Sequence, residues 1–108
     1  MGIYRKLRSC RTFRRKRLPF LQTLEDFDLV AEIGYGQETG RLITLKQLFL
    51  AGLGPTATVQ RRLARLKAQG VVIPLRSDAD RRVVQLSIDP EVHKAVRQYV
   101  ALLRLKGA

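Results

Sequence analysis

The chain has 108 residues, enough for a single domain, and its 45% apolar and 28% charged residues are typical of a globular protein. The 21 basic and nine acidic side chains give a formal charge of +12, which favours a polyanionic partner; a role in solubility alone is the alternative. A single cysteine excludes an internal disulfide, and with only one histidine beside it a zinc site of soft ligands is not expected. No apolar run is long enough to span a membrane or to serve as a signal sequence, so we expect a cytoplasmic protein without membrane contact.

Positive charge is concentrated at the start of the chain. Residues 1–17 carry eight basic side chains and no acid, and basic density without a clear apolar period predicts a flexible arm. Three interpretations stay open: contact with phosphates or a minor groove, a solvated tail without a fixed role, and an extension upstream of a misassigned start codon. The folded domain is therefore expected over residues 18–108.

The next segment has the pattern of an amphipathic helix over residues 23–35. Thr23 is a suitable N-cap, and acids follow in the first turn, where the helix dipole favours them. Apolar residues recur at helical spacing up to Gly34, and glycines then predict the exit into a loop. The acids are interpreted as a solvated or partner-facing surface; they are Glu25, Asp26, Asp28 and Glu32.

Two further helices are separated by a tight turn. Thr44 and Gln47 form a capping-box pattern that predicts a short helix over residues 45–51. Glycines follow, and a third helix is expected over about residues 55–69, with Pro55 in its first turn and Gly70 as its stop.

The helix over residues 55–69 has two contrasting faces. Val59, Leu63 and Leu66 form one apolar stripe, which predicts burial against the two earlier helices. At 100° per residue, small residues and arginines lie on the other side, and no acid stands among them. A solvated basic face is the alternative interpretation, but it does not account for alanine and threonine between the arginines.

The last third of the chain predicts a β-hairpin and a final helix. A β-branched strand over residues 71–73 and a returning strand from Val83 enclose a polar, turn-rich tip over residues 76–82. Asp89 then caps a helix over residues 90–106 whose two apolar stripes are consistent with a homodimer interface or with folding over the core. The fold class is thus mainly α with a small β-hairpin (α+β).

The predicted order of elements is that of a winged helix-turn-helix domain: helix, short helix, turn, helix, hairpin and helix. In such a domain the helix over residues 55–69 enters the major groove, and the wing over residues 76–82 lies on the minor groove or the backbone. We therefore predict a sequence-specific transcriptional regulator that binds double-stranded DNA. The residues predicted to contact DNA are Thr56, Ala57, Thr58, Gln60, Arg61, Arg65, Arg76, Arg81 and Arg82.

The segment from Leu42 to Leu86 also resembles the winged-helix core of the MarR (multiple-antibiotic-resistance regulator) family. The resemblance is carried by Leu45 and Leu48, by the run Ala57-Thr58-Val59-Gln60-Arg61, and by Leu63, Leu66, Gly70 and Val71. It implies a dimeric regulator of transcription, which in a bacterial cell is associated with the nucleoid. The helices that flank the core are shorter than those of the family, so a small-molecule effector is not predicted, although it is not excluded.

Two other classes of binding protein remain as alternatives. One is a non-specific nucleic-acid binder, architectural or RNA-binding, and the other is a winged-helix module that binds protein. An enzyme is not expected, and no catalytic, cofactor or metal site is predicted. Cys10 lies in the basic segment without a nearby histidine, and His93 stands alone in the first turn of the last helix.

Overall fold

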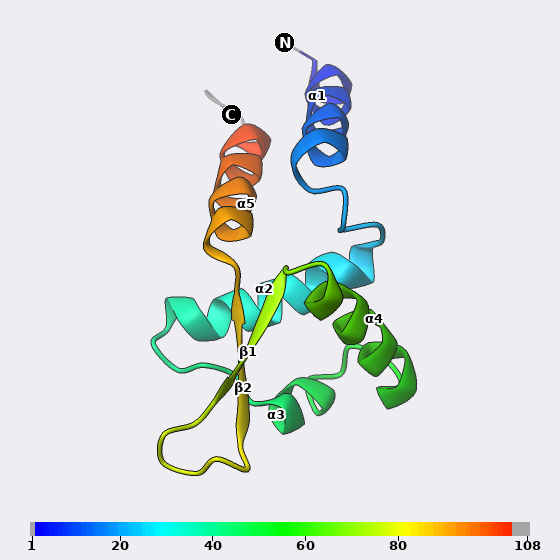
Figure 1. Cartoon of the computed structure of the whole chain (residues 1–108). Helices are drawn as coiled ribbons and strands as arrows, with labels where there is room; N and C mark the ends of the chain where they lie inside the picture. Colours follow the sequence, from blue (N-terminus) through cyan, green and yellow to red (C-terminus); the bar gives the residue numbers. More distant parts are fainter. Residues whose placement is uncertain (1, 105–108) are drawn as a thin grey trace.

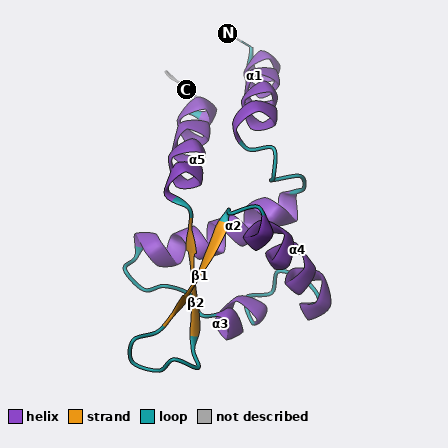
Figure 2. Cartoon of the chain, in the orientation of Figure 1, coloured by secondary structure: helices purple, strands orange, loops and turns teal. Residues whose placement is uncertain are grey.

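The computed structural model describes residues 2–104, which form five helices and one antiparallel sheet of two strands (Figure 1, Figure 2). In chain order the elements are α1 (Ile3–Arg17), α2 (Leu24–Glu38), α3 (Leu45–Phe49), α4 (Thr56–Ala68), β1 (Val72–Arg76), β2 (Val84–Ile88) and α5 (Pro90–Leu103). The predicted mainly helical fold with a β-hairpin is confirmed. From α2 onwards the order is that of a winged helix-turn-helix domain.

Capping side chains begin three of the helices at the predicted positions. Thr23 and Asp26 form a reciprocal capping box at the start of α2, and Thr44 and Gln47 do so at the start of α3. The carboxylate of Asp89 accepts hydrogen bonds from the first-turn N–H groups of α5. Local side-chain chemistry therefore determines where these helices start.

The expectation of a flexible arm over residues 1–17 is wrong, because residues 3–17 form helix α1. A stripe at helical spacing, Ile3, Leu7, Cys10 and Phe13, is present in the sequence but is outnumbered by basic residues. Cys10 is completely buried in the structure, and α1 packs against α5. Cys10 and Phe13 stabilise the helix because α5 provides an apolar surface against which they pack, whereas Ile3 and Leu7 remain exposed.

Tyr99 of α5 joins three helices. Its ring stacks on Phe13 of α1 at a centroid distance of 6.1 Å and lies 5.8 Å from the ring of Phe27 in α2. Arg14 donates a hydrogen bond of 3.0 Å to the Tyr99 hydroxyl. These contacts attach α1 to the winged-helix core.

Several predicted boundaries shift. Helix α2 runs past the predicted residue 35 to Glu38, and Gly36 lies inside it, where a Cβ would stand 2.8 Å from the Arg41 carbonyl oxygen. The glycine allows the following loop to approach the helix, rather than ending it. Helix α5 ends at Leu103, since Arg104 has an extended backbone; residues 105 and 106 of the predicted helix lie outside the described residues.

Strand β1 is longer than the predicted residues 71–73 and contains Pro74. Pro74 stands opposite Leu86, whose N–H donates to the Ile43 carbonyl on the far side of β2. The two residues thus form a pair without mutual hydrogen bonds, and the nitrogen of Pro74 faces the open edge of β1. Proline costs no ladder hydrogen bond at this position.

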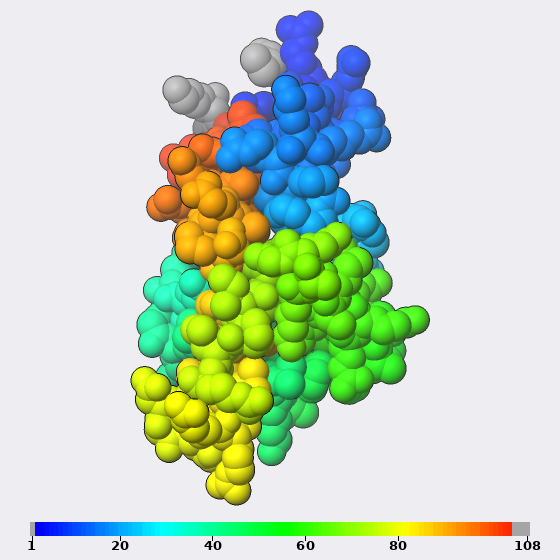
Figure 3. All heavy atoms as spheres, viewed as in Figure 1, coloured from blue at the N-terminus to red at the C-terminus, as the bar shows by residue number. Residues whose placement is uncertain are grey.

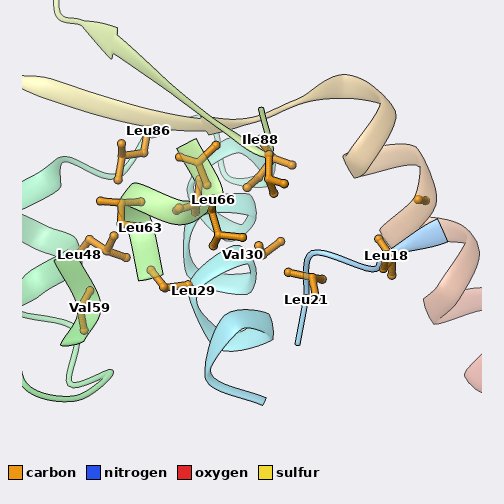
Figure 4. Close-up of a cluster of buried hydrophobic side chains, with 14 residues drawn as sticks. Leu18, Leu21, Leu29, Val30, Leu48, Val59, Leu63, Leu66, Leu86 and Ile88 are labelled. Carbon is orange, nitrogen blue, oxygen red and sulfur yellow. The ribbon is translucent and has the colours of Figure 1, made fainter. Parts of the chain in front are cut away.

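The core lies where α2, α3, α4 and the hairpin meet (Figure 4). The predicted stripe of α4, formed by Val59, Leu63 and Leu66, is at most 2% exposed. It packs in one cluster with Leu48 of α3 and Leu86 of β2. Burial of this stripe determines which face of α4 is turned outward.

The molecule is elongated, with extents of 51 × 27 × 23 Å. Helices α1 and α5 lie at one end, and α3 and the hairpin loop lie at the other (Figure 1, Figure 3). Helix α4 begins on the side of α3. The strongly basic α1 is therefore far from the hairpin loop.

Candidate nucleic-acid interface

The outward face of α4 begins with a group of small and polar side chains. Thr56, Ala57, Gln60 and Arg61 are exposed, and Thr58 is half-buried. Arg61 lies one turn from Thr58, with 3.5 Å between its Nη2 and the threonine hydroxyl oxygen. The structure therefore brings five of the predicted residues together on one solvent-facing surface.

Arg65 does not belong to that surface. Its Nη2 donates to the Asp26 carboxylate at 2.6 Å, and its Nη1 donates to the Phe20 carbonyl oxygen at 2.9 Å. These two contacts place the Arg65 side chain on the side of α4 that faces the start of α2. The guanidinium of Arg65, which is predicted to contact DNA, links α4 to the start of α2 in the structure.

Asp26 is completely buried, which corrects its interpretation as part of a solvated acidic surface. Its Oδ2 accepts hydrogen bonds from the backbone N–H groups of Gln22 and Thr23, at 2.9 and 3.2 Å. Its Oδ1 faces Arg65 and also Arg62, whose Nε is 3.8 Å away. A buried carboxylate needs such partners, because burying an unpaired charge is costly. The neighbouring acids Glu25 and Asp28 are exposed.

A hollow of about 350 Å³ lies where this side of α4 meets the start of α2. Three arginines and one buried acid contribute to it, so its charge is positive. The residues around it are Gln22, Thr23, Asp26, Thr58, Arg61, Arg62 and Arg65. The hollow extends the basic surface of α4 towards α2.

The loop between β1 and β2, residues 77–83, is held in shape by arginines. Arg76 donates a hydrogen bond of 3.0 Å to the Arg81 carbonyl oxygen. Asp80 accepts from the backbone N–H of Arg82 at 3.0 Å and from its guanidinium at 3.3 Å. The hydrogen bond from the Arg82 backbone, and then that from its side chain, lower the pKa of Asp80 below 3.8. Arg81 and Arg82 are exposed.

Two basic residues absent from the predicted set stand beside it. Lys46 is exposed on α3 and borders, together with Arg82, a hollow of about 350 Å³ between α3 and the wing. Arg62 borders the hollow next to Asp26. Lys46 is the second residue after Thr44, so its place at the start of α3 could have been read from the capping box. The position of Arg62 depends on the packing of α4 against α2, which no local pattern encodes.

Other kinds of site are not found in the described part of the chain. Within residues 2–104 no group of three or more histidine, cysteine, aspartate or glutamate side chains could hold a metal ion. No helix among these residues is long and apolar enough to cross a bilayer.

Solved structures with a similar fold are regulators of transcription. A mutant of MepR from S. aureus superimposes with a TM-score of 0.65 at 16% identity, over 85% of this chain and 66% of that one. MarR from E. coli, solved with operator DNA, gives 0.61 at 20% identity over 94% of this chain and 70% of that one. AbsC, a MarR-family transcriptional regulator from Streptomyces coelicolor, superimposes with a TM-score of 0.57 at 16% identity, over 94% of this chain and 70% of that one.

These likenesses establish the fold. The chain has the winged-helix fold of the MarR-family regulators, as the resemblance of residues 42–86 implies. It spans about two thirds of the length of these neighbours. No protein-family model matches the sequence, and no curated protein matches it as a relative.

Proposed function

We propose that the protein is a transcriptional regulator that binds double-stranded DNA in a sequence-specific manner. In this proposal α4 enters the major groove and the wing, residues 76–82, lies on the minor groove or the backbone. The observation that carries it is the outward face of α4, which presents small, polar and basic side chains while the opposite stripe is buried.

The chemistry of this face suits the edges of base pairs. Ala57 and Thr58 allow close approach of the helix, Arg61 can donate two hydrogen bonds to guanine, and Gln60 can pair with adenine. Pro55 provides no side-chain cap, so the first-turn N–H groups of α4 have no capping side chain and can donate to a phosphate. Arg65 is left out of the proposed reading residues because Asp26 holds its guanidinium.

The wing supplies three arginines at the same end of the molecule as α3. Arg76 and Arg82 order the loop through the contacts described above, and Arg81 enters these contacts through its carbonyl oxygen. Arginines in an ordered loop at that end of the molecule are suited to phosphates and to a narrow minor groove. The operator complex of MarR from E. coli supports DNA as the partner, although it is a property of that protein.

We further propose that two copies form a homodimer through the end that carries α1 and α5. Large apolar side chains are exposed there, among them Ile3 and Leu7 on α1 and Val100 and Leu103 on α5. An apolar cleft of about 620 Å³ lies beside them between α2 and α5. Exposed apolar surface next to an apolar cleft suits a second copy of the chain, whose twofold symmetry would match a palindromic site.

The test is selection of bound sites from a random duplex pool, followed by titration of Arg61→Ala on the selected site. We expect a loss of about 1–3 kcal/mol on that site, together with relaxed preference at one base pair. Lys94→Ala removes an exposed charge from α5 and serves as the matched control, with unchanged binding expected. Footprints of Arg61→Ala identical to those of the parent would contradict the proposed role of α4.

A further inference from the structure

Helix α1 presents a basic face that takes no part in the proposed DNA reading. Its packed side is marked by buried Cys10 and half-buried Phe13, which lie against α5. At 100° per residue, Arg5, Arg8 and Arg15 point away from that side. All three are exposed, as are Arg11 and Lys16 on the margins of the same face.

The charge of this face is not balanced locally. Helix α1 contains no acidic residue. Among residues 2–104, the ion pairs are those of Asp26 and Asp80, and both acids lie outside α1. Clustered guanidinium groups repel one another, and a bound polyanion would relieve that repulsion.

The face also has a shaped centre. A hollow of about 240 Å³ is lined by Arg5, Arg8, Ser9, Arg11 and Thr12. The hydroxyls of Ser9 and Thr12 each donate at 3.2 Å to the carbonyl four residues earlier, so the arginines are the donors that remain for a ligand. Three guanidinium groups around one hollow suit an oxyanion with several acceptors, such as a phosphate.

We propose that this face binds the phosphate backbone of a second DNA segment, so that one protein molecule joins two segments. The inference depends on the proposed function for the first segment. Arginines at every third or fourth residue recur at about 4.5–6 Å along a helix axis, so this face carries a regular row of positive charge that can follow the regular negative charge of a duplex strand. The preference for arginine over lysine favours phosphate recognition.

The location of α1 distinguishes the second segment from the first. The molecule is 51 Å long, and α1 lies at the end opposite the wing and α3 (Figure 1, Figure 3). A straight duplex seated on α4 and the wing does not extend along the molecule to α1. Ile3 and Leu7 project from another side of α1 than Arg5 and Arg8, so pairing of two copies through them leaves the basic face open.

The experiment measures capture of a second duplex. A short duplex with the selected site is immobilised, the protein is bound to it, and retention of a free fluorescent duplex is recorded over a range of salt concentrations. The test variant replaces Arg5, Arg8 and Arg11 by Gln. The control replaces Arg41 and Lys94 by Gln, two exposed basic residues outside α1, the proposed reading surface and the cleft between α2 and α5.

We expect the parent and the control to capture the second duplex and the α1 variant to lose capture at least tenfold. The slope of log capture against log salt should fall by about 3, at roughly 0.9 per lost phosphate contact. Circular dichroism and light scattering should show unchanged helix content and oligomeric state in the variant, so that loss of folding or pairing is separated from loss of the site.

Four results would overturn the inference. The first two are binding of the immobilised duplex without capture of the second, and equal capture by the α1 variant. The third is an equal fall in salt slope on a single duplex, which would place the α1 arginines on the first segment. The fourth is displacement of the second duplex by polyglutamate as readily as by unlabelled DNA, which would favour an acidic protein as the partner. Failure of the proposed function has a different signature, since the immobilised duplex would then retain no protein.

Discussion

The two basic regions of this molecule differ in how their charge is balanced. At α4 and the wing an acid stands beside the arginines: Asp26 holds Arg65, and Asp80 holds Arg82. Helix α1 carries eight basic residues, and no acid of its own balances them. An arginine that is paired with an acid is held in one geometry and can help to shape a specific binding surface. Arginines without an acidic partner attract a polyanion but do not fix its position. Net charge alone therefore does not distinguish the proposed reading surface from the basic face of α1.

The largest expected effect concerns the buried acid. Asp26→Asn should lower the free energy of unfolding by about 3 kcal/mol, at the lower end for a broken buried ion pair, because the Arg65 side chain is 30% exposed. Urea denaturation measures this loss. Asp28→Asn, at an exposed position of the same helix, is the control and should change stability by less than about 0.5 kcal/mol.

The same variant tests whether Asp26 keeps α4 selective. Two arginines released from the carboxylate are free to contact phosphates, so the salt slope for unrelated duplexes should steepen by about 1–2. An unchanged slope in Asp26→Asn would show that Asp26 supports the fold without restraining Arg62 and Arg65.

A smaller effect is expected at the contact between α1 and α5. Phe13→Ala removes the ring that stacks on Tyr99 and should cost about 1–2 kcal/mol of unfolding free energy, less than for a fully buried ring. Loss of helical circular dichroism should accompany it. Tyr4→Ala, at a side chain that is 78% exposed, is the control. If both variants unfold like the parent, α1 does not depend on this contact.

The smallest effect concerns the wing and its dependence on pH. Asp80 has a pKa below 3.8 in the folded chain. Its hydrogen bonds with Arg82 therefore stabilise the wing above pH 3.8, and this stabilisation is lost as pH falls through the folded pKa. We expect the amide resonance of Arg82 to titrate with a midpoint below 3.8. Asp80→Asn should abolish the titration; its persistence would assign the change to another group.

The local signals in the sequence were sufficient for most of the winged-helix core. Thr23, Thr44 and Asp89 cap the helices where the sequence predicts caps, because capping depends on residues within one turn. The buried stripe of α4 was predicted for a similar reason, since its period lies within a single helix. These local features are sufficient to predict the order of the core elements without any long-range contact.

Features that depend on distant partners could not be predicted in the same way. The burial of Asp26 requires Arg65, which is 39 residues away in the sequence. The helical state of residues 3–17 requires α5, whose Tyr99 lies 85 residues beyond Arg14. A sparse apolar stripe in α1 was available as a signal, but whether it is covered depends on a helix at the other end of the chain.

Pro74 has a consequence for the behaviour of the protein at high concentration. The outer edge of β1 has no neighbouring strand in the described part of the chain, and an uncovered edge of this kind can recruit a strand from another molecule. A residue without an N–H stands in the middle of that edge and interrupts the row of donors that an added strand would require. Pro74, which removes no hydrogen bond between β1 and β2, therefore also protects the hairpin against aggregation.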